Sequence, residues 1–265
     1  RDRPSQAAHA GRKVSELIWD IDRMFMLGAG LAVKASDRLG FQGEFWLNIE
    51  DGEGSMDDYD WFNLSPDWTH WSHHEATDVT EGSVIDINAD LRFYSVPGLS
   101  LSGIGGFRWE RYAWNAYGGE AVYSINGFRD YRFRVPDSEL GVSYEQTYYT
   151  PYLGIGLDSA RGKFALHGRL KYSPFVGGEF LDHHHARELV FSGEYTGGSM
   201  LGVDISGSYA ITDRLALKAG LQFHKYELEK FDMVWSEQGY TQTVPNAAGM
   251  KNETSLLLLS LAYTF

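Results

Sequence analysis

The sequence contains no cysteine, only seven prolines and no excess of basic residues. Without cysteine, disulfide bonds play no part in its stability. The net charge of −13 argues against nucleic-acid binding, since proteins that bind phosphates are normally basic. The sequence also has no apolar run near the roughly 18 residues that a membrane-spanning helix needs.

Aromatic residues, by contrast, make up 15% of the chain, and the 30 glycines suit turns between extended strands. Residues 83–94 alternate with the period of two that is typical of a strand. Ile85 and Ile87 fall on one face, whereas Asp86 and Asn88 fall on the other. The same alternation recurs in residues 40–51, 163–173 and 214–224 and predicts an all-β protein.

The predicted strands are too long for an ordinary soluble sheet, and their polar faces carry charges of both signs. A polar lumen and an apolar outer face are typical of an antiparallel transmembrane β-barrel. We predict nine strands, at residues 12–33, 40–51, 80–95, 99–115, 139–157, 163–179, 188–211, 214–235 and 251–265. Because single-chain bacterial barrels usually have an even number of strands, we expect one domain, residues 1–265, of about ten strands with the first missing or truncated.

The predicted connections alternate between short and long. Short turns are expected at residues 34–40, 95–100, 158–163 and 211–215. Long polar loops are expected near residues 51–80, 115–138, 179–188 and 236–252. This pattern favours short periplasmic turns and long extracellular loops, so we expect a bacterial outer-membrane location. A closed barrel has no free edge, and we expect a monomer.

Three carboxylates crowd into GSMDDYDW, residues 54–61. Asp58 and Asp60 lie two positions apart, so in an extended strand they point to the same side, whereas Asp57 points to the other. Two carboxylates that share a site cannot both ionise easily, and the pKa of one should rise. Such a pair can hold a proton and stabilise a developing oxyanion.

A second cluster lies in GGEFLDHHHAREL, residues 177–189. Asp182 and His184 are again two positions apart and share a face. A carboxylate orients the tautomer of a neighbouring imidazole and raises its basicity, so this pair could act as a general base. Since there is no cysteine and no serine in a nucleophile-elbow pattern, an activated water is the favoured nucleophile.

Other interpretations of both clusters remain open at this point. An acidic run is often a solvated loop or a calcium site. The histidines of residues 183–185, with His70, His73 and His74, could bind zinc or another transition metal. Against this, His184 points away from its two histidine neighbours in an extended strand.

At these residues the sequence resembles the omptin family of outer-membrane endopeptidases. The resemblance covers essentially the whole chain and rests on seven segments: AGRKVSELIWD (10–20), GSMDDYDW (54–61), NGFRDY (126–131), TPYLGIGL (150–157), RLKYSPFV (169–176), DHHHARELVF (182–191) and the ending LAYTF. It implies that Asp58 and Asp60 form a catalytic carboxylate pair and that Asp182 and His184 form a catalytic dyad. A water held between the pairs would attack the peptide bond next to a basic residue, on the extracellular side.

The resemblance also implies substrate and lipid contacts, with departures from the family pattern. The acidic pocket residue expected two positions before Asp182 is Phe180 here, with Glu179 beside it. His70 stands where some members carry a carboxylate, and Asp2 corresponds to an acidic residue of the first strand. Arg111 matches a position through which the family contacts lipopolysaccharide, which the resemblance implies as an activating lipid. No metal or other cofactor is expected.

Three functions are therefore compared. The first is a water-activating endopeptidase whose partners are peptides or proteins with basic residues, lipopolysaccharide and the membrane. The second is a catalytically silent barrel that acts as an adhesin or binds host proteins, motivated by Phe180. The third is a metal-binding or small-solute barrel, motivated by six histidines in two loops, namely His70, His73, His74 and residues 183–185.

Overall fold

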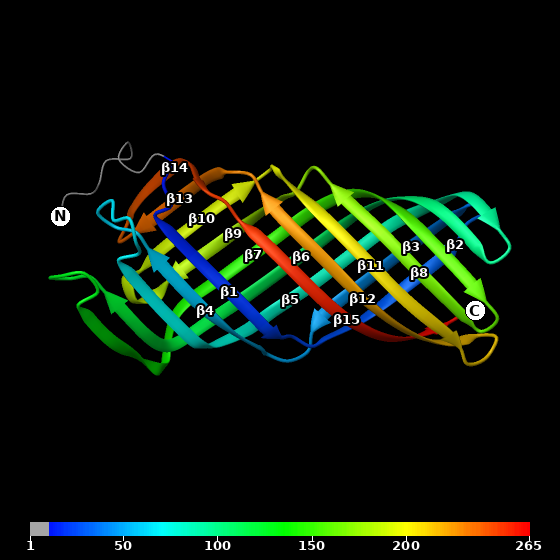
Figure 1. Cartoon of the computed structure of the whole chain (residues 1–265), viewed down its shortest axis with the longest axis horizontal. Coiled ribbons are helices and arrows are strands. Elements are labelled where there is room, and N and C mark those ends of the chain that lie inside the picture. Colours follow the sequence, from blue (N-terminus) through cyan, green and yellow to red (C-terminus); the bar gives the residue numbers. More distant parts are fainter. Residues whose placement is uncertain (1–10) are drawn as a thin grey trace.

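The computed structural model describes residues 11–265, which form a single antiparallel sheet of fifteen strands (Figure 1). The strands are β1 (Ser15–Arg23), β2 (Met26–Lys34), β3 (Leu39–Asn48), β4 (Gly52–Asp60), β5 (His70–Val96), β6 (Leu99–Tyr123), β7 (Tyr131–Arg161), β8 (Phe164–Ser173), β9 (Gly177–His184), β10 (Leu189–Tyr195), β11 (Gly198–Ala210), β12 (Leu215–Leu228), β13 (Phe231–Glu237), β14 (Tyr240–Ala248) and β15 (Lys251–Tyr263). The predicted all-β barrel is confirmed. Within residues 11–265, no helix has the length and apolarity needed to cross a lipid bilayer.

The expected count of about ten strands differs from the fifteen observed, because six of the long spans are broken by short interruptions. The broken spans are β1–β2, β3–β4, β8–β9, β10–β11, β12–β13 and β14–β15. Together with β5, β6 and β7 they make nine spans, which correspond in order to the nine predicted strands. Among the described residues, no pairing joins β1 or β2 to β14 or β15.

The long loops are shorter than predicted, and that prediction is wrong in extent. Strands β4 and β5 occupy most of residues 51–80, and β6 and β7 extend into residues 115–138. The connections that remain are residues 61–69, 124–130, 185–188 and 238–239. Beyond the apolar band both sheet faces are partly polar, so hydropathy no longer alternates although the backbone pairing continues.

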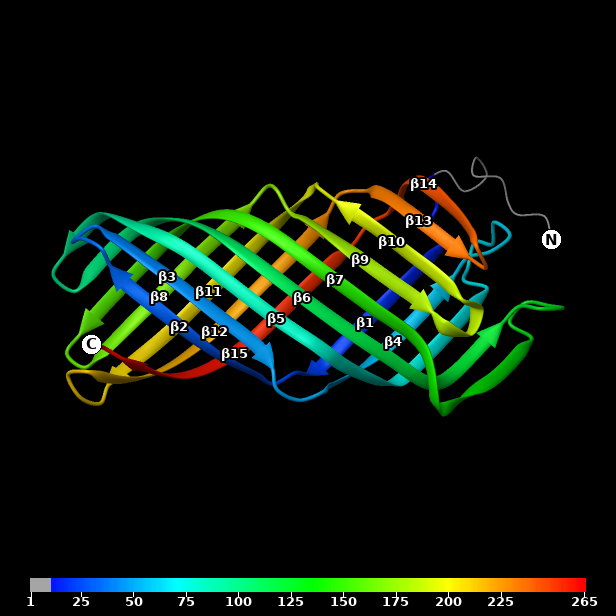
Figure 2. The ribbon, with the colours of Figure 1, turned by 180° about the vertical axis from the view of Figure 1, so that it is seen from behind.

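The short turns are confirmed and lie at the same end of the molecule as the C-terminus (Figures 1 and 2). The turn between β5 and β6 has Pro97 followed by Gly98, whose φ is +80°. Proline presets the first central residue of a type II turn, and glycine takes the positive φ of the second without steric cost. The opposite end of the barrel carries the longer connections.

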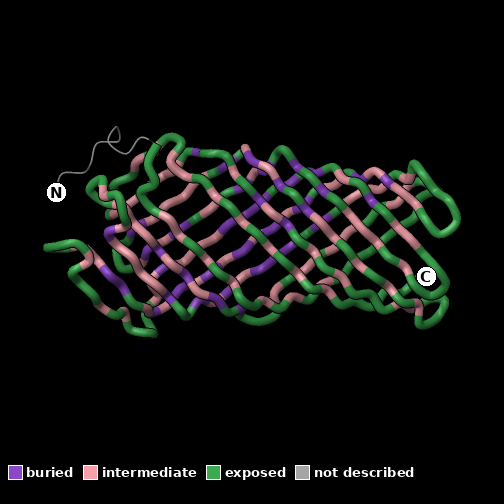
Figure 3. Tube along the Cα trace, viewed as in Figure 1, coloured by how far each residue is buried: buried purple, intermediate pink, exposed green. Residues whose placement is uncertain are grey.

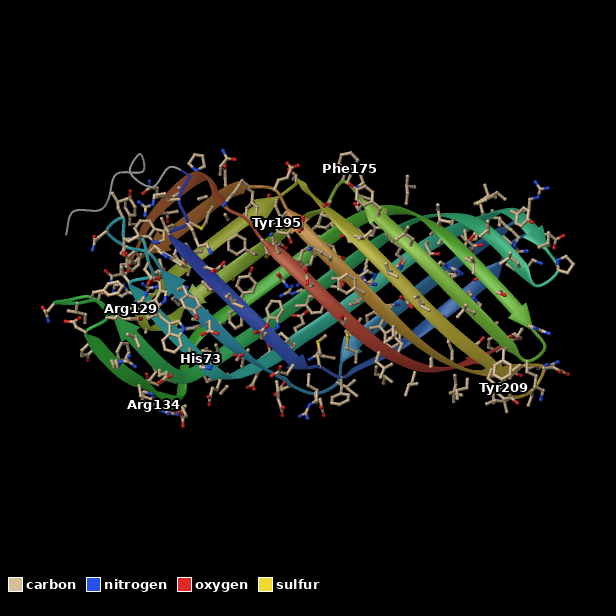
Figure 4. All side chains as sticks on the ribbon, viewed as in Figure 1. His73, Arg129, Arg134, Phe175, Tyr195 and Tyr209 are labelled. Atoms are coloured by element: carbon tan, nitrogen blue, oxygen red, sulfur yellow. The ribbon has the colours of Figure 1, made fainter. Side chains whose placement is uncertain are left out.

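The predicted alternation between the two faces is confirmed. Ile87, Leu91 and Phe93 of β5 are exposed on the outside, whereas Asp86 is 1% exposed and points into the lumen. Figure 4 shows the same contrast between Phe175, which projects outward, and Tyr195, which lies inside. Buried residues gather along the middle of the barrel (Figure 3). An exposed apolar belt around a polar interior is the arrangement that lipid requires.

Buried ion pairs cross the lumen inside this belt. Arg108 contacts Asp86 at 3.4 Å and Glu110 at 3.0 Å. Lys171 contacts Asp86 at 3.0 Å and Asp204 at 2.8 Å. Arg108, Asp86 and Glu110 are each only 1% exposed, so every charge depends on its partners rather than on water. These contacts join β5, β6, β8 and β11 across the interior.

Replacing Arg108 by alanine should therefore destabilise the barrel by about 3–5 kcal/mol, because it leaves the carboxylates of Asp86 and Glu110 buried with fewer partners. The measurement is urea unfolding of the refolded protein in lipid vesicles, followed by tryptophan fluorescence. Arg134→Ala is the control, since Arg134 pairs with Asp137 on the exposed surface and its loss should change stability by less than about 0.5 kcal/mol. Equal stability of the two variants would contradict the argument.

Candidate active site

The two predicted clusters meet on the inner face of the sheet, beyond the apolar belt and at the end with the longer connections. Asp58 and Asp60 lie on β4, and Asp182 and His184 lie at the end of β9. Strand β4 pairs with β1 and β5, whereas β9 pairs with β7 and β10. The clusters therefore face each other across the interior, and the period of two in each strand aims both members of each pair inward.

Asp182 and His184 form a hydrogen-bonded dyad. The Nε2 of His184 lies 3.1 Å from Oδ2 of Asp182, and both residues are buried. Asp182 therefore accepts from Nε2–H, which assigns the lone pair of the neutral imidazole to Nδ1. Burial alone would lower the pKa of His184, but the hydrogen bond to Asp182 and the charges of Asp182 and Asp58 together raise it. His184 is thus a stronger base than a free imidazole.

The aspartate pair approaches the dyad closely. Oδ2 of Asp58 lies 3.9 Å from Nδ1 of His184. Burial, followed by the neighbouring charge of Asp60, raises the pKa of Asp58 to about 7. The pKa of Asp60 is also raised by burial, although the charge of Arg187 and a hydrogen bond with Ser15 oppose the shift. The pKa of Asp58 is thus raised, but burial contributes more to the rise than the neighbouring carboxylate of Asp60 does.

Two buried oxygens at this site have no hydrogen-bond partner among the described residues. They are Oδ1 of Asp58 and Oδ1 of Asp182. Buried polar atoms in proteins are nearly always paired, and each exception calls for an explanation such as a bound water or a catalytic role. One water can hydrogen-bond to two atoms 3.9 Å apart, because two bonds of about 2.8 Å can span that distance. A water between Oδ2 of Asp58 and Nδ1 of His184 would therefore be placed for His184 to deprotonate it.

The neighbours of these residues in sequence point outward. Asp57 accepts hydrogen bonds from Nε1 of Trp71 at 2.8 Å and pairs with Nδ1 of His73 at 3.0 Å. The rings of His183 and His185 pack 4.0 Å apart, and Nε2 of His185 lies 2.8 Å from Oγ of Ser143. In the part of the chain that the structure describes, no group of three or more histidines, cysteines or acids is placed to hold a metal ion.

The residues expected to contact substrate are divided between the faces. Phe180 lies on the inner face, where its ring stacks on Tyr144 with 6.2 Å between ring centroids. Glu179 is exposed on the opposite face of β9, so the strand does not bring it to the dyad. His70 pairs with Asp60 in the register of β4 and β5, and its ring packs against Phe62. Asp2 lies outside the described residues.

Arg111, expected to contact lipid, lies on the outside of the barrel at about half exposure. Its Nε lies 3.1 Å from Glu81, and its Nη2 lies 3.0 Å from Glu145. The two carboxylates fix the guanidinium on the outer wall.

Two residues near the dyad were not predicted from the sequence. Tyr144 lies opposite Asp182 in the register of β7 and β9. Arg187, in the 3₁₀ turn η2 (His185–Arg187), donates from Nη2 to Nδ1 of His184 at 3.3 Å. To predict Tyr144, one would have to know the register of β7 and β9. Arg187 follows His184 by three positions, but it lies in a turn, so no sequence periodicity predicts where its side chain points.

The raised pKa of Asp58 lowers the free energy of unfolding at neutral and alkaline pH. The folded state holds this proton up to about pH 7, whereas the ordinary pKa of an aspartate carboxyl is 3.8. The stability linked to this proton is present below about pH 4 and is lost as the pH rises to about 7. Asp58→Asn should therefore be more stable than the parent by roughly 2 kcal/mol at pH 8 and nearly equal to it at pH 4. Urea unfolding in vesicles at the two pH values checks this, and a constant difference would contradict it.

Comparison with known proteins agrees with the fold. A model of the omptin family matches residues 5–265. The plasminogen activator of Yersinia pestis is 28% identical, covering 97% of this chain and 83% of the relative. The outer membrane protease OmpP of Escherichia coli K12 is 26% identical, covering 100% and 86%. The crystal structure of the outer membrane protease OmpT from Escherichia coli superposes with a TM-score of 0.92 at 24% identity, covering 98% of this chain and 90% of that one. With a family match over nearly its whole length, the chain belongs to the omptin family.

Proposed function

We propose that this protein is an outer-membrane endopeptidase that activates a water through Asp182 and His184 opposite Asp58 and Asp60. One observation carries the proposal: Nδ1 of His184, the nitrogen left free by Asp182, lies 3.9 Å from Asp58. Membership of a family with relatives named as proteases supports it.

The proposed reaction follows from the protonation states of the two pairs. Neutral His184 takes a proton from the water through Nδ1, while Asp182 stabilises the resulting imidazolium. The hydroxide attacks the carbonyl carbon of the peptide bond. Asp58 and Asp60, which share one proton, donate a hydrogen bond to the oxyanion, and the leaving amine receives a proton from the site. The shared proton belongs to the pair rather than to one aspartate.

We further propose cleavage next to basic residues. The net charge of −13 attracts cationic peptides, and three carboxylates line the site. Within this acidic setting, Phe180 offers an aromatic ring to the substrate beside the dyad, and His70 lies next to Asp60.

The surroundings of the site support two further proposals, which concern its orientation in the membrane and its activation by a lipid. The longer connections lie at the same end as the dyad, and in outer-membrane barrels this end faces the outside of the cell. The protein works there as a monomer, activated by lipopolysaccharide whose phosphates compete with Glu81 and Glu145 for Arg111.

His184→Ala and Asp58→Ala should each reduce kcat for a fluorogenic peptide with adjacent arginines by at least about 10³-fold, because each removes a group that acts on the reacting atoms. The assay uses protein refolded with lipopolysaccharide. The strand geometry supplies matched controls: His183→Ala and Asp57→Ala remove the same residue types from the outer face and should leave kcat within about twofold.

If no peptide is cleaved by folded parent protein, the endopeptidase proposal fails. Undiminished adhesion to host proteins by His184→Ala would then favour the silent barrel.

A mechanism in which no metal activates the water predicts that a chelator has no effect. Incubation with 1,10-phenanthroline should leave cleavage unchanged, since the proposed base is an imidazole and not a metal-bound hydroxide. The 1,7-isomer has the same aromatic rings but does not chelate, so it is the control for inhibition by the rings themselves. Loss of activity with the chelating isomer alone, restored by zinc, would replace this mechanism with the metal-dependent one.

A further inference from the structure

Arg187 places a positive charge beside Asp58, Asp60 and Asp182, the three carboxylates that form the acidic groove. Turn η2 joins β9 to β10 and closes through the N–H of Glu188, which donates to the carbonyl oxygen of His185. Glu188 takes a positive φ of 51°, and the chain reverses direction there. This reversal brings Arg187 back over the end of β9, where its Nη2 reaches Nδ1 of His184 at 3.3 Å.

The charge of the guanidinium acts on several residues of the site. Its charge lowers the pKa of both Asp58 and Asp60, which opposes the effect of burial on this pair. Burial lowers the pKa of His70 on β5, and the charge of Arg187 lowers it further. Burial raises the pKa of Tyr123 on β6, and the charge of Arg187 opposes that rise. Arg187 therefore lies next to the nitrogen of His184 that faces Asp58, close to the atoms that would react.

The contact of Arg187 is weak enough to be displaced. Its hydrogen bond to Nδ1 of His184 is long, at 3.3 Å, and among residues 11–265 no carboxylate lies within 4.0 Å of its guanidinium in an ion pair. Arg187 is also exposed to solvent. By contrast, Arg108 in the lumen has two carboxylate partners and is almost completely buried.

The contact is also incompatible with the proposed reaction. Nδ1 of His184 has one lone pair, and the N–H of Arg187 occupies it. The same lone pair has to accept the proton of the attacking water. Arg187 must move away before the reaction, and a substrate cation that approaches the acidic groove meets it first.

We propose that Arg187 is a specificity-determining residue, a resident cation that competes with the basic side chain of the substrate for the acidic groove. This inference rests on the proposed peptidase function and deepens it. A substrate with arginine beside the cleaved bond has to displace Arg187 against the repulsion of like charges. A neutral side chain of the same shape does not meet that repulsion. Arg187 thus makes the preference for basic residues weaker than the acidic groove would produce without it.

The test compares two peptides that differ only in arginine or its neutral isostere citrulline beside the cleaved bond. In Arg187→Gln, KM for the arginine peptide should fall about tenfold relative to the citrulline peptide, with kcat changed by less than about threefold. Arg187→Lys keeps the charge and should keep the parent ratio. Arg134→Gln, which removes a charge from the exposed end of the barrel (Figure 4), is the control for net charge.

A binding measurement supplies a second readout. Nα-acetyl-arginine amide should inhibit Arg187→Gln about tenfold more strongly than the parent, whereas the citrulline analogue should inhibit both alike. An equal fall of kcat for both peptides would make Arg187 a positioning residue and overturn the proposal, and an unchanged ratio of KM values would also overturn it. If the parent cleaves but the ratio is unchanged, only this inference fails; if folded parent cleaves neither peptide, the proposed function fails with it.

Discussion

Every backbone N–H and C=O group in the lipid-facing part of this protein has to find its partner inside the sheet, because the hydrocarbon region supplies no water. This constraint accounts for the length and continuity of β5, β6 and β7, which run through the apolar belt without a break. It also determines where the reactive groups can lie. Asp58, Asp60, Asp182 and His184 are carried on paired strands rather than on flexible loops, so their geometry is fixed by the same ladder that crosses the membrane.

The charged residues of the interior have different surroundings at different positions along the barrel. Inside the apolar belt, Arg108 and Lys171 pair with carboxylates, and each charge is compensated by its neighbours. At the candidate active site, Asp58 and Asp182 lie against one imidazole, that of His184, and burial raises the pKa of Asp58 to about 7. A strongly raised pKa of a buried carboxyl is typical of a site that acts on a ligand. The difference separates the structural lumen from the reactive groove although both are polar.

The face of each side chain could be predicted from the sequence, because a period of two assigns faces without knowledge of the fold. Asp58 and His184 point inward, and Asp57 and His183 point outward, as alternation requires. The limits of the loops could not be predicted, since polar strands outside lipid lose the hydropathy pattern but keep their pairing. The position of Arg187 could not be predicted either, because a turn residue follows no periodicity and its contact with His184 depends on the positive φ of Glu188.

The pairing of β4 with β5 also determines how far the reactive groove stands from lipid. Asp58 pairs with Ser72, whereas Ile85 is the first exposed large apolar residue of β5. At a rise of about 3.3 Å per residue and a tilt of about 40°, the intervening segment corresponds to a height of roughly 30 Å. A peptide lying flat in the headgroup layer is out of reach at that height, whereas an unfolded segment or a protruding loop of another protein can enter. Under the proposed function, the scaffold therefore selects substrates by distance from the bilayer, in addition to any selection by sequence.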